Sequence, residues 1–302
     1  MKTILHLKSI SDLYRFFGLG HGHHPLAAIV DFRTLNDHRP DPVRIVTDFY
    51  SIMFKNYCGN ILRYGRKNVD FQDGSLLCVA PNQILESDEE IENKEDMIGW
   101  GVFFHPDLIR SSSLGQAIKN YSFFTYETSE ALHLSQKEKN ILIDCVQKID
   151  SELRENIDTH SQSILISHLE LLLNYCARFY GRQFITRSAS NKSIITRVEQ
   201  IILSRISGQA DQPRGLLTVK DLADQVHLSA GYLSDVLKRE TGRNAQEHIH
   251  YFLIEEAKNR LRHSGGTINE IAWALGFEYP QYFNKLFKQK TGRTPMEYRN
   301  LN

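Results

Sequence analysis

The apolar positions in the last third of the chain follow one arrangement twice. In each copy a short run with helical spacing is followed, after a break, by a second run of the same period. The first copy has Leu222, Ala223 and Val226, then Leu233, Val236 and Leu237. The second has Ile271, Ala272 and Leu275, then Phe283, Leu286 and Phe287. Two successive helices, repeated once, are therefore predicted within residues 218–242 and 267–292.

Both copies begin and end with residues that typically limit helices. The predicted starts have capping-box spacing, Thr218 with Asp221 and Thr267 with Glu270. The predicted ends carry Gly242 and Gly292, and glycine tolerates a left-handed position after a helix. A short helix, a tight turn and a second helix form the helix-turn-helix plan, whose second helix can enter the major groove of DNA. An ordinary helical bundle remains the alternative for a single copy, and the repetition favours the helix-turn-helix interpretation.

A long helix is predicted between the two copies. Asn244 and Glu247 give a start similar to a capping box, and the helical pattern runs to His263 before Ser264-Gly265-Gly266 breaks it. About 19 residues at 1.5 Å each span roughly 28 Å. One turn of DNA measures about 34 Å, so two recognition helices at this order of separation suit successive major grooves.

These features make residues from about Ile194 to Arg299 similar to the DNA-binding domain of the AraC/XylS family of bacterial transcriptional regulators. The resemblance is carried in the first unit by Leu222-Ala223, Ser229, Tyr232-Leu233, Lys238 and Thr241-Gly242. In the second unit it is carried by Ile268, Ile271-Ala272, Gly276-Phe277, Tyr282-Phe283, Phe287-Lys288, Thr291-Gly292, Thr294-Pro295 and Tyr298-Arg299. It covers about a third of the chain. It implies an AraC-type DNA-binding domain at 194–302, with helix-turn-helix units at 218–242 and 267–292.

Helix geometry predicts which side chains face DNA. In the second recognition helix the side opposite the apolar stripe carries Pro280, Gln281, Asn284, Lys285 and Lys288. Gln and Asn can bond adenine edges, and Lys can reach guanine or phosphate. In the resembled family, the positions matching Gln281, Tyr282, Asn284 and Lys285 point towards the groove. The matching outward residues of the first recognition helix are Gly231, Ser234 and Asp235, together with Lys238. A solvated polar face is the alternative interpretation.

The residues from Leu26 to Phe104 have a β pattern. Strand-like runs are expected over residues 27–32, 43–54, 60–64, 75–79 and 98–104, with turn signals between them. Short strands with frequent turns indicate a small barrel or sandwich. The resemblance implies a cupin-like β-barrel that senses an effector, here within residues 1–135. The residues with polar groups suited to a small-molecule pocket are Arg44, Tyr50, Arg63, Tyr64 and His105.

Two helices are expected after the β region, in a dimerisation segment at residues 136–180. The second has Leu165, Leu169, Leu172, Cys176 and Phe179 at heptad spacing. Such a seam can pair with a second chain or with the preceding helix, and we favour a homodimer. The polar residues 181–193 are interpreted as an interdomain linker. The expected fold class is therefore an α+β two-domain protein with an all-α C-terminal domain.

Charge differs between the two parts of the chain. The 302 residues have a net charge of zero, which argues against a uniformly basic nucleic-acid binder. Residues 191–302, however, hold 16 Lys and Arg against 12 Asp and Glu, about +4, which leaves about −4 for residues 1–190. The predicted DNA-binding part is thus the basic part, as a phosphate-binding surface requires.

Other sequence features narrow the choice of function. The four cysteines, Cys58, Cys78, Cys145 and Cys176, are widely spaced, which is typical of a reduced cytoplasmic protein. No signal peptide or membrane span is expected. His21, His23 and His24 lie in a loop without the Cys, Asp or Glu that would complete a metal site, so no metal or cofactor is predicted. An enzyme built on the β region is disfavoured, because no phosphate loop, metal triad or nucleophile motif occurs.

The function expected from these observations is a sequence-specific DNA-binding transcriptional regulator, which acts as an activator or a repressor according to where its operator lies relative to the promoter. Double-stranded DNA, a small-molecule effector and a second copy of the chain are the expected partners, and RNA polymerase is a further candidate. The alternative is an effector-independent regulator, in which the β domain serves only dimerisation or protein contact.

Overall fold

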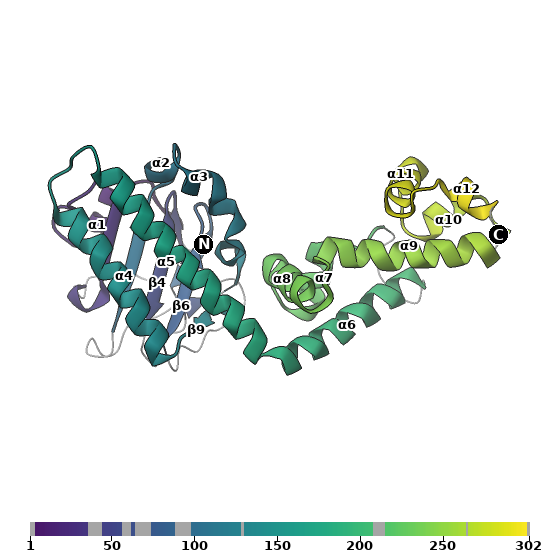
Figure 1. Cartoon of the computed structure of the whole chain (residues 1–302), viewed down its shortest axis with the longest axis horizontal. Coiled ribbons are helices and arrows are strands. Elements are labelled where there is room, and N and C mark those ends of the chain that lie inside the picture. The colour runs from purple at the N-terminus through teal and green to yellow at the C-terminus, as the bar shows by residue number, and fades with distance from the viewer. Residues whose placement is uncertain are drawn as a thin grey trace. The chain divides into compact units, whose positions relative to one another are not determined.

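The computed structural model describes residues 4–35, 44–55, 62–63, 74–87, 98–127, 130–207, 215–263 and 265–300. The chain divides into two units, Met1–Thr186 and Arg187–Asn302. Figure 1 shows strands and long helices in the first unit and a set of helices in the second. The described residues thus form an N-terminal region of β-sheets with helices, followed by an all-α C-terminal domain.

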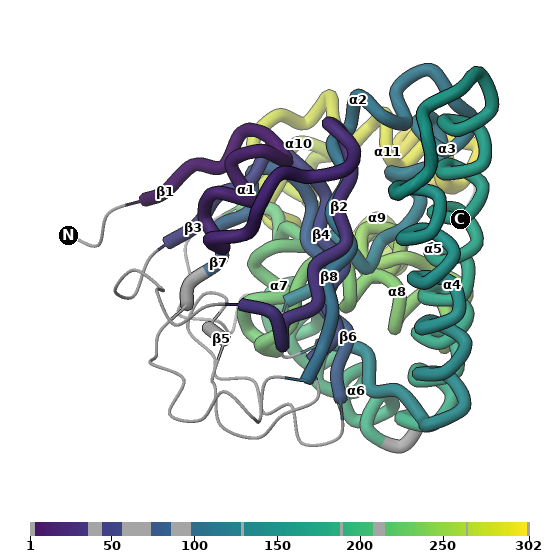
Figure 2. Tube along the Cα trace, turned by 90° about the vertical axis from the view of Figure 1, so that its left-hand side faces the viewer, coloured from purple at the N-terminus to yellow at the C-terminus, as the bar shows by residue number. Residues whose placement is uncertain are grey.

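Two β-sheets pack together in the N-terminal unit. The described strands are β1 (Ile4–Leu7), β2 (Ala27–Asp31), β3 (Arg44–Thr47), β4 (Tyr50–Lys55), β5 (Leu62–Arg63), β6 (Ser75–Val79), β7 (Ile84–Ser87), β8 (Gly99–Phe104) and β9 (Leu132–His133). The larger sheet has the antiparallel order β2-β8-β4-β6-β9. The smaller has the order β1-β3-β7-β5, in which β1 and β3 are parallel. Figure 2 shows β1, β3 and β7 on one side of β2, β8 and β4.

Strand β4 serves both faces of the larger sheet, because successive side chains of a strand point to opposite sides. Tyr50 stacks on Phe104 at 5.0 Å between ring centroids and meets Phe124 at 4.9 Å. Ser51 and Met53 lie on the other face, towards the smaller sheet. The helices therefore cover one face, and the apolar space between the sheets lies at the other.

Helices α4 (Gln136–Arg154) and α5 (Ser161–Thr186) cover the larger sheet (Figure 1). Arg182 Nη2 donates to the Glu138 carboxylate at 2.7 Å and to the carbonyl of His133 at 2.7 Å. Gln183 is buried, accepts from the backbone N–H of His133 at 2.9 Å and donates to the carbonyl of Ala131 at 3.2 Å. Polar contacts thus hold the end of α5 against α4 and β9.

Short helices complete the N-terminal unit. They are α1 (Ile10–Phe16), η1 (Phe32–Thr34), α2 (Pro106–Ile109), α3 (Ser113–Ala117), η3 (Ile118–Asn120) and η4 (Ser122–Thr125). Helix α1 has a complete capping box between Ser9 and Asp12, and its buried Ile10 and Leu13 pack between the sheets. These helices close the gaps left by short strands.

The strand pattern of the sequence is confirmed in part. Strands β2, β6 and β8 lie where they were expected, but the single strand expected over residues 43–54 is wrong. It is divided into β3 and β4 by a bend at Asp48 and Phe49, where Thr47 Oγ1 donates to the carbonyl of Phe49 at 2.9 Å. Strands β1, β7 and β9 were not predicted, since each is too short to show a period. Of the run expected over 60–64, only residues 62–63 lie within the described residues.

The apolar seam of α5 packs within its own unit. Its members are Leu165, Leu169, Leu172, Cys176 and Phe179, all at most 5% exposed. The seam is therefore buried by its own unit, where Cys176 lies against Cys78 of β6, so it packs on the larger sheet and not only on the preceding helix. The segment interpreted as a linker is also largely helical: α5 ends at Thr186 and α6 (Ser188–Ile206) begins two residues later, so the boundary between the units falls inside residues 181–193.

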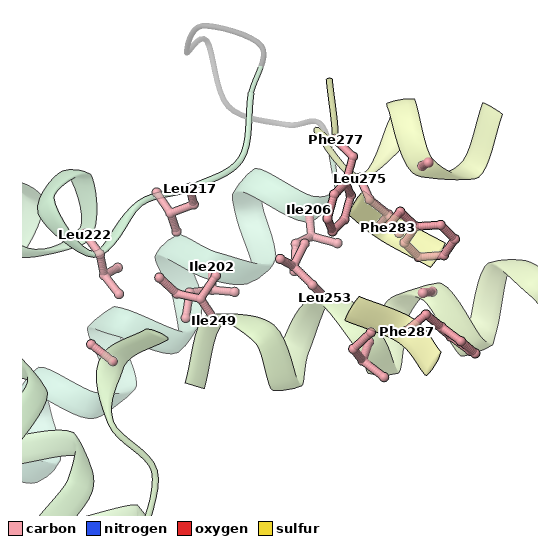
Figure 3. Close-up of a cluster of buried hydrophobic side chains, with 14 of the residues drawn as sticks. Ile202, Ile206, Leu217, Leu222, Ile249, Leu253, Leu275, Phe277, Phe283 and Phe287 are labelled. Atoms are coloured by element: carbon pink, nitrogen blue, oxygen red, sulfur yellow. The ribbon is translucent and has the colours of Figure 1, made fainter. Parts of the chain in front are cut away.

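The C-terminal domain is built around one helix. Its elements after α6 are α7 (Val219–Val226), α8 (Ala230–Thr241), α9 (Ala245–His263), α10 (Ile268–Ala274), α11 (Pro280–Thr291) and α12 (Pro295–Arg299). Ile249 and Leu253 of α9 lie in one buried cluster that also contains Leu222 of the first helix pair and Phe283 of the second (Figure 3). The predicted helices of both repeats and the 19-residue helix between them are confirmed.

The two turns of the repeats hold a left-handed residue at the same position. It is His227 in the first, with φ of 59°, and Gly276 in the second, with φ of 90°. A Cβ on Gly276 would also come within 2.8 Å of the carbonyl oxygen of Gly215. Glycine is thus required in the second turn both by the backbone conformation and by the close approach of another segment.

We expect Gly276→Ala to lower the free energy of unfolding of the C-terminal domain by about 1–3 kcal/mol, because strain and backbone contact act together. Urea unfolding can be followed by the fluorescence of Trp273 in a Trp100→Phe background, since the chain has two tryptophans. Gly265→Ala is the matched control, as a Cβ there meets nothing within 4 Å. Equal effects of the two substitutions would contradict the requirement for glycine at 276.

Candidate nucleic-acid interface

Capping boxes set the start of the first helix in each repeat. Thr218 Oγ1 accepts from the N–H of Asp221 at 3.1 Å, and Asp221 accepts from the N–H of Thr218 at 3.0 Å. Thr267 and Glu270 make the same exchange at 3.2 and 2.7 Å. The hydrogen bond from the Thr218 hydroxyl lowers the pKa of Asp221, and the backbone N–H of Thr267 lowers the pKa of Glu270. Both carboxylates therefore stay ionised at neutral pH, and the predicted caps are confirmed.

Helix α11 separates its apolar and polar residues onto opposite sides. Phe283 and Phe287 are fully buried, and their rings lie 5.7 Å apart in the core. Positions three, four and seven apart share a helix face. The exposed residues of the opposite face at this spacing are Gln281, Asn284, Lys285 and Lys288. Pro280 is the first residue of the helix and is half-buried, while Tyr282 is 59% exposed.

Helix α8 presents a different surface at the matching positions. Gly231, Ser234 and Asp235 are half-buried, and Lys238 is exposed. Tyr232 is 4% exposed, in contrast to Tyr282 at the same place in α11. The structure thus brings the predicted residues onto one face of each helix, but that face is less open in α8.

Ser234 also has a bond within the domain. Its hydroxyl accepts from the backbone N–H of Ala245, the first residue of α9, at 3.2 Å. The residue that matches Ala245 in the second repeat is Pro295, which has no N–H. Asn284, which matches Ser234, therefore has no such donor to satisfy and makes no side-chain hydrogen bond among the described residues.

The basic residues of the domain fall into two groups. Several arginines act inside it: Arg299 Nη2 donates to the carbonyl of Gly266 at 2.8 Å, and Arg260 Nη2 to that of Ile206 at 2.8 Å. Arg243 lies 4.0 Å from the ring of Tyr251. The lysines of α11 are Lys285, Lys288 and Lys290, and no acidic residue occurs in that helix. In α8 two basic residues are offset by Asp235 and Glu240. Of the second helices of the two repeats, α11 therefore carries the greater net positive charge.

Exposed aromatic side chains lie in the second repeat, and the sequence patterns drew attention to one of them only. Trp273 on α10 is 57% exposed and Tyr279, before α11, is 50% exposed. The ring of Tyr279 meets that of Tyr282 edge-on at 5.8 Å. The outward position of Trp273 follows from helical spacing, since its neighbours Ile271 and Ala272 are buried.

The polar residues suggested for an effector pocket do not gather in one place. Tyr50 belongs to the aromatic group on the helix side of the larger sheet. His105 caps α2, where its Nδ1 accepts from the N–H of Asp107 at 3.2 Å. Arg44 is exposed at the start of β3, while Tyr64 lies outside the described residues, and of Arg63 only its backbone position in β5 is described. The suggestion that they form one site is therefore not supported by the residues that can be placed.

Neither a metal-binding cluster nor a membrane-spanning helix occurs among the described residues. No group of three or more His, Cys, Asp or Glu side chains there is arranged to hold a metal ion. His24 instead accepts from the N–H of Leu26 at 3.1 Å through Nδ1. None of the helices in the described ranges combines the length and apolar content of a membrane span.

Comparison with known proteins finds the strongest similarity in the last third of the chain. Residues 222–301 match a family model described as a helix-turn-helix domain. The chain is 37% identical over 84 residues to the uncharacterised transcriptional regulator YobQ of Bacillus subtilis, covering 28% of this chain and 35% of that protein. It is 23% identical over 192 residues to the uncharacterised regulator YijO of Escherichia coli, covering 64% of each. The C-terminal domain of AraT, a response regulator from Geobacillus stearothermophilus, has a TM-score of 0.33 and 28% identity, covering 36% of this chain and 85% of that one.

Two helix-turn-helix units on a shared core define this protein as one that carries a double helix-turn-helix domain. The chain spans from about a third to two thirds of the length of the curated relatives it matches. Its C-terminal domain is an AraC-type helix-turn-helix domain, of the kind found in transcriptional regulators.

We expect Ser234→Ala to lower the free energy of unfolding of the C-terminal domain by about 0.5–1.5 kcal/mol, because the N–H of Ala245 loses its acceptor. Asn284→Ala, at the matching position, is the control and should leave the stability nearly unchanged. Urea unfolding of the full chain measures both. Equal losses would show that Ser234 has no special structural role.

Proposed function

We propose that this protein is a sequence-specific DNA-binding transcriptional regulator whose N-terminal domain responds to a small-molecule effector. The observation that carries the proposal is the outward face of α11. It combines amide and ammonium groups directly opposite the buried Phe283 and Phe287, on the second helix of a helix-turn-helix unit. Such a face matches both the polarity of base edges and the charge of phosphates. The proteins matched by the chain include transcriptional regulators, which supports the same function.

The two recognition helices have unequal roles in this proposal. Gln281 and Asn284 bond adenine edges, Lys285 and Lys288 bond guanine or phosphate, and Tyr282 with Pro280 adds apolar contact. In α8, Lys238 contacts phosphate and Asp235 accepts from a cytosine amino group. Gly231 allows the backbone to approach the groove. Because α8 carries no net charge, the first unit contributes selectivity rather than general affinity.

The N-terminal unit supplies regulation and assembly. We infer that its two sheets belong to a cupin-like barrel, since both contribute side chains to a cavity between them. Effector binding there shifts the population of arrangements in which both units suit their operator. RNA polymerase is the further partner of an activator, and the cytoplasm is the compartment where these partners meet.

A homodimer forms in this proposal through the outer side of α5. Ile164, Leu171 and Ile185 are 41%, 40% and 61% exposed and lie at multiples of seven residues from one another. This spacing aligns them in one row along the helix, about 100° round from the buried seam. Two copies of one helix with such a stripe can bury it against each other.

The function is tested by selecting bound duplexes from a random pool with the full-length protein at two salt concentrations. We expect a motif of two short elements about one helical turn apart.

Asn284→Ala should relax the preference at one base position by about 1–3 kcal/mol. Gln289→Ala is the matched control, because this exposed amide lies about 140° further round the same helix. No enrichment at either salt, or equal effects of the two variants, would contradict the proposal.

We expect a sedimentation mass of two chains at micromolar concentration, and a mass of one chain for Leu171→Glu, because a carboxylate cannot be buried in the apolar stripe without a partner. Ala177→Glu adds the same charge at another exposed position of α5 and should leave the dimer intact. A single-chain mass of the unchanged protein would rule out this interface.

A further inference from the structure

A cavity of about 110 Å³ lies between the two sheets of the N-terminal unit. Leu7 and Leu85 reach it from the smaller sheet, Met53 and Phe103 from the larger one, and Leu13 and Phe16 from α1. Among the described residues that line it, Thr47, Ser51 and Lys55 are polar and all the others are apolar. The walls are therefore built for an apolar occupant.

One polar group on this wall has no partner. The Ser51 hydroxyl is buried, the residue is 1% exposed, and no hydrogen bond reaches its Oγ within the described part of the chain. Ser51 lies opposite Val79 on β6 and Phe103 on β8, so its flanking side chains are apolar. A buried hydroxyl without a partner is costly, since it loses its bonds to water and gains none. A ligand that bonds this hydroxyl would remove the cost.

Thr47 and Lys55, the other two polar residues that line the cavity, already have interactions of their own. Thr47 Oγ1 already donates to the carbonyl of Phe49 at 2.9 Å. Lys55 is four residues from Ser51 along β4, which is roughly 13 Å at the rise of a strand. Its ammonium lies 5.6 Å from the centre of the Phe32 ring. The side chains that flank Ser51 are apolar, so a charged ligand bonded to its hydroxyl would lose its hydration without an opposite charge beside it.

We infer that the cavity binds a small uncharged apolar molecule, of the size of a single aromatic ring, that carries one hydroxyl or carbonyl group bonded to Ser51. Cavities of roughly 150 Å³ lined by aliphatic and aromatic side chains stay dry and take up benzene. The cavity here is smaller, at about 110 Å³, which limits its occupant to one ring with at most a small substituent. The inference rests on the proposed effector function and names the chemical class of that effector. A sugar does not fit, because its many hydroxyl groups would find one partner among apolar walls.

Phenol and toluene test the inference, because they have the same number of heavy atoms and differ in the hydroxyl. We expect calorimetry on the full chain without DNA to show that phenol binds about 3- to 10-fold more tightly than toluene. In Ser51→Ala phenol should bind no more tightly than toluene, because its hydroxyl is then buried without a partner. Benzoate and xylose, as charged and polar probes, should not bind.

The stability of Ser51→Ala gives a second readout. Because the hydroxyl has no bond to lose, the midpoint of thermal unfolding should stay unchanged or rise. Ser75→Ala is the matched control: Ser75 is also fully buried in a strand, but its hydroxyl is bonded to His133 Nδ1 at 3.3 Å. The control should unfold about 2–4 °C lower. An equal decrease of the unfolding midpoint in both variants would show that Ser51 is bonded to trapped water, and would contradict its role as the partner of a ligand.

The remaining outcomes separate this inference from the proposed function. Absence of binding by both probes, equal binding of both by the unchanged protein, or binding of benzoate or xylose would overturn the ligand class. DNA selection tests the regulator without any ligand and stands or falls independently. If phenol binds as expected while operator affinity stays the same, the ligand class holds and the effector coupling is wrong.

Discussion

Burial of one side of α9 is the constraint on which the DNA-binding domain depends. Ile249, Leu253, Ala257 and Leu261 are at most 5% exposed and contribute to a cluster that reaches both helix-turn-helix units. A short helix pair cannot bury its apolar stripe alone, and here each pair shares the same central helix. Because close-packed side chains do not deform continuously, this shared core holds the two recognition helices in one arrangement. The surface that meets DNA is therefore a property of the core beneath it.

The two repeats show how one pattern accommodates different chemistry. Pro295 replaces Ala245, so one backbone N–H disappears and the residue that would bond it is released to the surface. His227 replaces Gly276, so the first turn accepts a left-handed residue with a side chain where the second has a close contact with Gly215. Neither change alters the apolar stripe. The two units share their apolar packing, while single residues at its edge differ and leave α11 more exposed than α8.

The N-terminal unit is organised differently, because both faces of its larger sheet are in contact with other parts of the unit. One face of β4 joins the aromatic layer under α4 and α5, and the other meets the cavity. Gly101 on β8 leaves room for the Phe103 ring at the cavity wall, since a Cβ at position 101 would come within 2.4 Å of that ring. Packing against the sheet buries the apolar seam of α5, and the exposed stripe of Ile164, Leu171 and Ile185 remains on its surface. The proposed dimer contact and the proposed ligand site thus lie on opposite sides of one sheet.

The sequence by itself determined the C-terminal domain to the level of single helices. Capping pairs such as Thr267 with Glu270 and apolar spacing such as Phe283 with Phe287 act within one or two turns, so neighbouring residues suffice to recognise them. Tertiary structure alone decided the pairing of β1 with β3, the bend at Phe49 and the isolation of Ser51, because these depend on segments far apart in the chain. The same holds for the seam of α5, whose spacing suits a second chain as well as its own sheet. Interactions between neighbouring residues can be recognised in the sequence. Which distant segment a strand or an apolar seam packs against is decided only when the whole unit folds.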